Sequence, residues 1–276
     1  MDRFDYVTIG HITEDVGENG NVLGGAVSFA GLMARSLGCK TAVLTSAAAD
    51  YDFAHALPNL TVHHIPAAKT TTFTNVYTDT GRRQTLHARA AQITIADLPD
   101  GWERATIAHF APIADEIDVE MVQAFSGAQI CLTPQGWLRG WDENGRVFPI
   151  DWEAARAILP LATAIITSEE DVPNHDTIVM YKQYARLLVV TDGAKGCTVF
   201  MNGEKRQFRS PPVTGTLETT GAGDIFSASF FVRLYQTGGN PWEAARFANQ
   251  MASRSVMAHG IEAKIKRIKE ELAISE

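Results

Sequence analysis

Residues 218–231, Glu-Thr-Thr-Gly-Ala-Gly-Asp-Ile-Phe-Ser-Ala-Ser-Phe-Phe, predict more about this chain than any other stretch. Gly221 and Gly223 flank an alanine, an aspartate follows, and an apolar helix is predicted to begin at once. A helix N-terminus carries unpaired N–H groups and the positive end of the helix dipole, which together attract anions. Glycine lets the backbone approach such an anion closely. The stretch therefore predicts an anion-binding turn at the start of a helix.

The carboxylate of Asp224 on the same turn indicates chemistry beyond anion binding, because like charges repel. A carboxylate fits there if it takes a proton from a hydroxyl that then attacks phosphorus, which is the layout of a phosphoryl-transfer site. The alternative from these residues alone is an ordinary helix start. Asp224 would then be a capping residue, and Phe226, Phe230 and Leu234 would be core residues.

Composition predicts a globular α/β protein and excludes several classes of function. The chain has 276 residues, 45% of them hydrophobic, which suits one large domain with a substantial core. The net charge of −8, with no basic run before the tail, argues against nucleic acid as a partner. Cys39, Cys131 and Cys197 are widely spaced and fit a reducing compartment. With no signal-peptide pattern and no run long enough to span a membrane, we expect a cytoplasmic protein.

Short apolar runs alternate with helical patterns along most of the chain. This alternation predicts a mostly parallel sheet covered by helices on both faces, with the active site at the carboxyl ends of the strands. The pair Asn240-Pro241 is typical of a helix start. The predicted strands are 6–10, 40–45, 106–110, 128–133, 164–167, 187–191 and 198–200, and the predicted helices are 26–37, 116–125, 151–158, 177–184 and 240–258.

Residues 70–95 break this alternation. They are rich in Thr, Tyr and Val, and Asp79-Thr80-Gly81 is a turn pattern, so residues 73–78 and 84–88 are predicted to pair as a β-hairpin. The hairpin is either a lid that excludes water from the site or an ordinary surface feature.

The longer pattern Thr219-Thr220-Gly221-Ala222-Gly223-Asp224-x-Phe-x-x-x-Phe closely resembles the C-terminal signature of the ribokinase-like carbohydrate kinases, the PfkB family. The resemblance continues in order over nearly the whole chain. It implies a three-layer ribokinase-like sandwich over residues 1–276, with a mostly parallel central sheet and a small β lid at about 70–95.

The resemblance also implies an acceptor site near the N-terminus. Asp15, after the first strand, is similar to the family's sugar-binding aspartate, which accepts hydrogen bonds from two hydroxyls. Gly24, Gly25 and Ser28 lie in a segment similar to the family's glycine pair and first large helix. Phe29 departs from the pattern, because many sugar kinases of the family have Asn there. Ser28-Phe29 is similar to the myo-inositol kinase-like branch.

The turn at 191–196, Thr-Asp-Gly-Ala-Lys-Gly, resembles the family's nucleotide-phosphate turn, which implies that Thr191, Gly193 and Gly196 hold phosphates of ATP. A plain hairpin turn is the alternative. Asn249 is expected near the adenine.

Residues 168–171, Ser-Glu-Glu-Asp, follow a strand where the family usually has Asn-x-x-Glu, an element that helps to organise Mg²⁺. Glu170 and Asp171 are therefore the candidate metal ligands. The family resemblance extends to a monovalent cation near the anion turn, but no residue of the sequence identifies its ligands.

The expected function is ATP-dependent phosphorylation of a hydroxyl on a small sugar or polyol. Asp224 would be the general base, and Gly221, Ala222 and Gly223 would form the anion hole. The alternatives are a nucleoside or vitamin kinase of the same fold and a non-catalytic sugar-binding regulatory protein. A homodimer through the lid is a further expectation.

Overall fold

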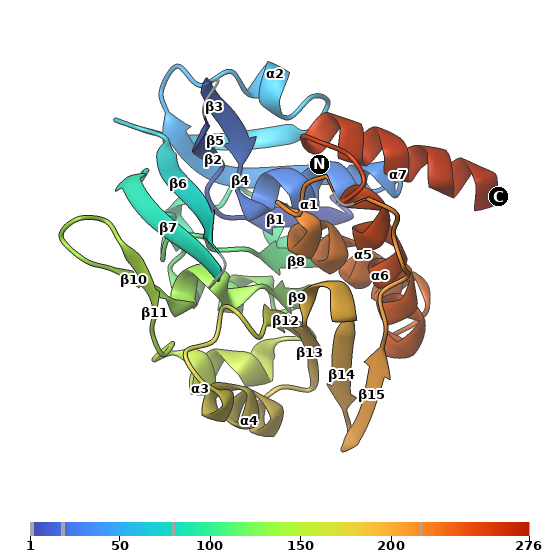
Figure 1. The fold of residues 1–276 in the computed structure, drawn as a ribbon. Coiled ribbons are helices and arrows are strands. Elements are labelled where there is room, and N and C mark those ends of the chain that lie inside the picture. Colours follow the sequence, from blue (N-terminus) through green and yellow to red (C-terminus); the bar gives the residue numbers. More distant parts are fainter. Residues whose placement is uncertain (1–2, 18–19, 79–80, 216, 276) are drawn as a thin grey trace.

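The computed structural model describes residues 3–275 except 18–19, 79–80 and 216. Its centre is a sheet in the order β15-β14-β13-β12-β9-β8-β1-β4-β5 (Figure 1). The strands from β13 to β5 pair in parallel, and β14 and β15 are antiparallel additions at one edge. The strands are β1 (Tyr6–Ile9), β4 (Thr41–Ala48), β5 (Thr61–Ala67), β8 (Ile107–Phe110), β9 (Gln129–Leu132), β12 (Ala164–Ser168), β13 (Leu187–Thr191), β14 (Cys197–Met201) and β15 (Glu204–Phe208).

Helices cover both faces of this sheet, so the predicted layered α/β architecture is confirmed (Figure 1). Successive strand residues point to opposite faces. Tyr6 accordingly packs in the core under α1, α5, α6 and α7, and Val7 packs in the core under α3 and α4. The helices are α1 (Ala26–Ser36), α2 (Phe53–Ala56), α3 (Ala155–Ile158), α4 (His175–Tyr184), α5 (Ala222–Gln236), α6 (Pro241–Ser255) and α7 (Ile261–Ser275).

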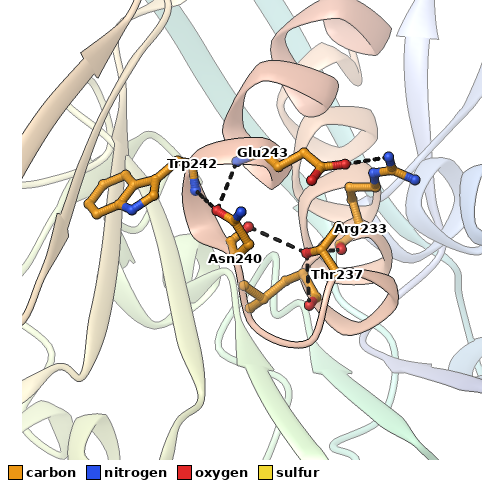
Figure 2. Close-up of polar contacts among 6 residues, drawn as sticks. Arg233, Thr237, Asn240, Trp242 and Glu243 are labelled. Carbon is orange, nitrogen blue, oxygen red and sulfur yellow. Dashed lines mark hydrogen bonds and ion pairs between the residues drawn. The ribbon is translucent and has the colours of Figure 1, made fainter.

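The junction between α5 and α6 shows why the helices begin and end where they do (Figure 2). The side chain of Asn240 accepts hydrogen bonds from the N–H groups of Trp242 and Glu243, at 3.1 and 3.3 Å. At the end of α5, the Thr237 hydroxyl donates to the carbonyl of Arg233, and the Arg233 side chain pairs with Glu243. The helix start predicted from Asn240-Pro241 is confirmed.

A second, four-stranded sheet has the order β3-β2-β6-β7, formed by β2 (Thr13–Gly17), β3 (Gly20–Gly24), β6 (Thr71–Thr78) and β7 (Gly81–Ala88). The predicted hairpin is confirmed as β6 and β7; residues 79–80 of its predicted turn lie outside the described residues. A further hairpin, β10 (Arg139–Trp141) with β11 (Val147–Pro149), contacts β7 through a hydrogen bond from Leu86 N–H to Gly145 O at 2.8 Å.

The helix predicted over 116–125 is wrong at its start. The described element is a 3₁₀ helix, Val119–Phe125. Glu116 is fully buried, and its carboxylate accepts hydrogen bonds from the N–H groups of His11, Ile113 and Ala114. A carboxylate that satisfies three loop N–H groups fixes irregular backbone in place, and this interaction outweighs local helix propensity.

Candidate active site

Four parallel strands end at the edge of the sheet where the helix α5 begins. The direction in which strands are added reverses at β1, which has β4 on one side and β8 on the other. Ligands of open α/β sheets bind at the carboxyl ends of strands, beside such a reversal. A cavity of about 70 Å³ lies at this edge. Its lining comes from the ends of β8, β9, β12 and β13 and from the N-terminal turns of α1 and α5.

Asp224 lines this cavity together with Gly223, Thr191, Ser168 and Asp171. These residues come from three segments that are far apart in the sequence, and the fold brings them to one place. A carboxylate, a hydroxyl and a helix N-terminus around one cavity can accept a proton and hold an anion in the same small volume.

The anion turn has a conformation that only glycine adopts easily. Gly221 has φ of 75°, and a β-carbon added to it would lie 2.2 Å from Cδ1 of Phe29. Phe29 is 3% exposed and belongs to the core. The ring of Phe29, the residue that departs from the family pattern, therefore packs under the anion turn.

The N–H groups of this turn are not equivalent. Ala222 N–H donates to the carbonyl of Thr219 at 3.1 Å, so that donor is engaged within the turn itself. The N-cap residue of α5 is Gly221, which has no side chain to accept a hydrogen bond from these groups. Gly223 and Asp224 both line the cavity, so their N–H groups are the candidate donors to an anion there.

The residues predicted to bind the acceptor lie at the junction of β2, β3 and α1. Gly24 ends β3 opposite Thr13, and a β-carbon on Gly24 would lie 3.1 Å from Oδ2 of Asp15. Gly25 precedes α1, whose first residue, Ala26, lines the cavity. The Ser28 hydroxyl is fully buried and donates to Gly24 O at 2.7 Å, so it stabilises the glycine pair.

Of the residues predicted to bind the nucleotide, one lines the cavity and the others lie in a turn or in a contact between elements. Thr191, at the end of β13, lines the cavity, whereas Gly193 and Gly196 form the turn into the antiparallel strand β14. The turn thus connects two antiparallel strands, and phosphate binding by Thr191, Gly193 and Gly196 stays a prediction. Asn249 is 4% exposed, and its side-chain amide donates to Phe208 O at 3.3 Å, which ties α6 to β15.

The two candidate metal ligands also differ in position. Asp171 lines the cavity and accepts a hydrogen bond from the Gln135 amide at 2.7 Å, whereas Glu170 is exposed and outside the lining. Within the described part of the chain, no group of three or more His, Cys, Asp or Glu side chains could hold a metal ion. A magnesium ion fits this arrangement if it is held by one carboxylate together with donor phosphates and water.

Thr133 and Gln135 also line the cavity, and the sequence analysis did not identify them. They lie at the carboxyl end of the strand β9, which was predicted, and this position is the feature of the sequence that could have identified them as site residues. The Thr133 hydroxyl lies 2.9 Å from Nε2 of the His109 ring. The other ring nitrogen of His109, Nδ1, lies 2.7 Å from the Tyr6 hydroxyl. Burial lowers the pKa of His109 from 6.5 to about 3, so this ring is neutral and fixes the cavity wall.

Sequence comparisons match part of this chain to known proteins. Residues 159–267, which include Asp171, Thr191 and Asp224, match the pfkB family carbohydrate kinase model. The ribokinase of Arabidopsis thaliana is 37% identical over 81 residues, which are 29% of this chain and 21% of that protein. The ribokinase of Bacillus subtilis (strain 168) is 41% identical over 78 residues, 28% of this chain and 26% of that protein. The matched sequence thus spans about a quarter of these relatives.

Solved structures resemble the chain over nearly its whole length. A pyrophosphate-dependent kinase in the ribokinase family, complexed with a pyrophosphate analog and myo-inositol, has a TM-score of 0.82 and 21% identity, covering 97% of this chain and 99% of its own. Arabidopsis thaliana ribokinase complexed with ribose and ATP has a TM-score of 0.71 and 18% identity, with the same coverage. At such identity the likeness shows the fold. Residues 159–267 thus carry the match to the pfkB carbohydrate kinases, and the predicted ribokinase-like fold is confirmed over nearly the whole chain.

Proposed function

We propose that this protein transfers a phosphoryl group from ATP to a hydroxyl of a small sugar or polyol. The observation that carries the proposal is the cavity that Asp224 lines together with Thr191 and with Gly223 in the first turn of α5. The relationship to carbohydrate kinases supports the same reaction class.

In this mechanism Asp224 accepts the proton of the acceptor hydroxyl as its oxygen attacks the terminal phosphorus of the donor. The N–H groups of Gly223 and Asp224 stabilise the negative charge of the transferring group. The Thr191 hydroxyl and the turn at Gly193 and Gly196 hold the remaining donor phosphates. A magnesium ion bound beside Asp171 would supply charge neutralisation to these phosphates.

The acceptor lies between this cavity and the small sheet. Asp15 accepts hydrogen bonds from two neighbouring hydroxyls. Gly24 and Gly25 let the backbone before α1 lie close against Thr13, in the strand that carries Asp15. A polyhydroxylated ring fits this chemistry. Since a kinase of the same fold binds myo-inositol, that compound is the first acceptor to test, with ribose second.

Replacement of Asp224 tests the catalytic step. We expect Asp224→Asn to bind donor and acceptor but to lower kcat by about 10²–10⁴-fold, the range for loss of a general base. Turnover is measured with ATP and Mg²⁺ across a panel of inositols, sugars and nucleosides. Asp176→Asn, at an exposed position on α4, is the matched control with wild-type kcat. Wild-type turnover in Asp224→Asn would refute the assignment.

Pyrophosphate is a second candidate donor. It is supported by the structural relative with a TM-score of 0.82, which is a pyrophosphate-dependent kinase. It is also supported by the position of Asn249, whose amide is engaged with Phe208 O rather than placed in the cavity. Parallel assays with ATP and pyrophosphate on each acceptor decide between the donors.

The same acceptor panel tests the remaining alternatives. A nucleoside or vitamin that outperforms every sugar and polyol would reassign the substrate class. Sugar binding in a thermal-shift assay without turnover from either donor would indicate a regulatory protein.

The single kinase domain over residues 1–276, the cytoplasmic location and the homodimer through the lid stay predictions. Val16, Val22 and Val76 are exposed on the small sheet and support the last of these. No helix in the described residues is long and apolar enough to cross a membrane.

A further inference from the structure

A buried ammonium group lies against the segment that leads into the anion turn. The side chain of Lys264, on α7, is 0% exposed. Its Nζ donates to the backbone carbonyl of Glu218 at 2.7 Å and lies 3.7 Å from Oε2 of the same residue. A buried cation is costly unless it is paired and hydrogen-bonded, and Glu218 supplies both kinds of contact. Burial lowers the pKa of Lys264, and the charge of Glu218 opposes that change.

Three further hydrogen bonds attach Glu218 and its neighbour Leu217 to the segment between α6 and α7. Its Oε2 accepts a hydrogen bond from Gly260 N–H at 2.7 Å. The N–H groups of Leu217 and Glu218 both donate to Val256 O, at 2.9 and 3.3 Å. The connection between α6 and α7 therefore fixes the residue that stands three places before Gly221.

The oxygen atoms around this ammonium are of the type that binds a monovalent cation. A backbone carbonyl and a carboxylate converge on one point beside the anion turn, and Lys264 Nζ is at that point. A metal cation near the anion turn was the expectation from family resemblance. The described residues do not fit that expectation at this place, because a side chain of the protein already satisfies the oxygens.

We propose that Lys264 is a positioning residue that supplies, as a fixed part of the chain, the positive charge that holds the anion turn in place. It follows that this kinase needs no potassium or sodium ion there. The inference rests on the proposed phosphoryl transfer, since the turn acts through Gly223 and Asp224.

The first measurement is the cation dependence of the wild-type enzyme. Turnover is compared in potassium, ammonium and tetramethylammonium chloride. We expect kcat to agree within about twofold at constant ionic strength, where screening of exposed charges is equal. Strong activation of the wild type by potassium over tetramethylammonium would overturn the proposal, because it would require a separate cation site.

The second measurement uses Lys264→Ala, which removes the ammonium and opens space for a small cation. In tetramethylammonium chloride we expect kcat to fall by about 10- to 100-fold, as displaced catalytic groups do, with a smaller change in the KM for the acceptor. Ammonium or potassium chloride should restore much of the lost kcat. Lys266→Ala, at an exposed position on the same helix, is the control and should behave as wild type. Unchanged kcat in Lys264→Ala, or a loss that no cation restores, contradicts the role.

Two readouts keep this inference separate from the proposed reaction. If Lys264→Ala does not fold, Lys264→Met keeps the length of the apolar stem and should show the same loss of kcat without rescue, because its side chain fills the space. If the wild type phosphorylates nothing, the proposed function fails, and Tm still tests Lys264. Ammonium chloride should then raise the Tm of Lys264→Ala more than that of wild type or Lys266→Ala, and equal shifts would refute the inference.

Discussion

Gly221 is the residue at which backbone conformation and side-chain packing constrain the site together. Its φ of 75° belongs to the left-handed region, and the ring of Phe29 occupies the space where a β-carbon would lie. Phe29 itself is packed in the core against α5. The anion turn therefore rests directly on the core, with no gap into which it could relax when a phosphate arrives.

Substitution of this glycine separates the two constraints. Gly215→Ala introduces the same backbone strain at φ of 75° with no atom within 4 Å, and we expect it to cost about 1–2 kcal/mol of stability. Gly221→Ala should cost a further 1–3 kcal/mol or so, typical of overpacking, and should lower kcat sharply. Urea unfolding and turnover of the two variants are compared. Equal stability of the variants would show that Phe29 moves aside freely.

The chemical residues of the site were predictable to the extent that their pattern is local. The glycines and Asp224 stand within four positions, and a helix start gives them a physical role wherever they occur. Lys264 could not be predicted, because its partner Glu218 is 46 residues away and nothing in an amphipathic helix marks one lysine as buried. Ser28 and Asn249 carry suitable polar groups, but only the fold shows that backbone carbonyls engage them.

At the scale of elements, the small sheet is attached to the rest of the molecule through a second hairpin. Leu86 N–H in β7 donates to Gly145 O, between β10 and β11. A β-carbon added to Gly145 would lie only 2.1 Å from the carbonyl oxygen of Leu86, so the two backbones are in close contact. The β10–β11 hairpin also carries Arg139, whose guanidinium lies over the Phe73 ring of β6. These contacts fix the position of the sheet that bears Asp15.

Gly145→Ala should loosen this attachment. The added β-carbon forces Leu86 and Gly145 apart, and we expect the KM for the acceptor to rise about fivefold or more, since one hydrogen bond is worth about 1 kcal/mol. The KM for ATP should change little. Gly203→Ala is the control, because it has a similar φ of 79° but nothing within 4 Å. An unchanged acceptor KM would mean that the small sheet does not position the acceptor.

Helices and strands could be predicted from the sequence where one short run of residues determines the element. The parallel strands β1, β4, β8, β9, β12 and β13 are largely buried and read as continuous apolar runs, so their bounds were predicted to within a few residues. The parallel edge strand β5 was not predicted, because its residues are exposed or half-buried and form no apolar run. The strands β2 and β3 are polar or glycine-rich, and β2 pairs with β6 across more than fifty residues, so no local signal marks them. The 3₁₀ helix at Val119–Phe125 was missed at its start because Glu116 is held by loop N–H groups.

The stability of the whole molecule should depend on pH through its buried histidines. His109 is fully buried, and its folded-state pKa is about 3 against an ordinary 6.5. Burial also lowers the pKa of His11. When the folded pKa is depressed, the unfolded state binds the proton first as the pH falls. The neutral ring therefore favours folding above pH 6.5, and this contribution decreases from pH 6.5 toward pH 3.

His109→Gln isolates this contribution. We expect the stability advantage of the wild type over the variant to shrink by about 2–3 kcal/mol between pH 7 and pH 4.5, since one pH unit corresponds to about 1.4 kcal/mol. Urea unfolding at several pH values measures it. The exposed His175→Gln should track the wild type throughout. Parallel stability curves for His109→Gln and wild type would show that His109 is protonated as easily in the folded chain.

The contact between α7 and Glu218 also sets an order on biosynthesis. Ribosomes release a chain from its N-terminus, and domains fold as they emerge. Glu218 leaves 46 residues ahead of Lys264. A nascent chain thus contains Glu218 and the nearby Asp224, the proton acceptor of the proposed reaction, well before it contains the ammonium group of Lys264. A chain that ends shortly before Lys264 contains Asp224 without the charge that holds the anion turn, and we expect its turnover to be at least as low as that of Lys264→Ala.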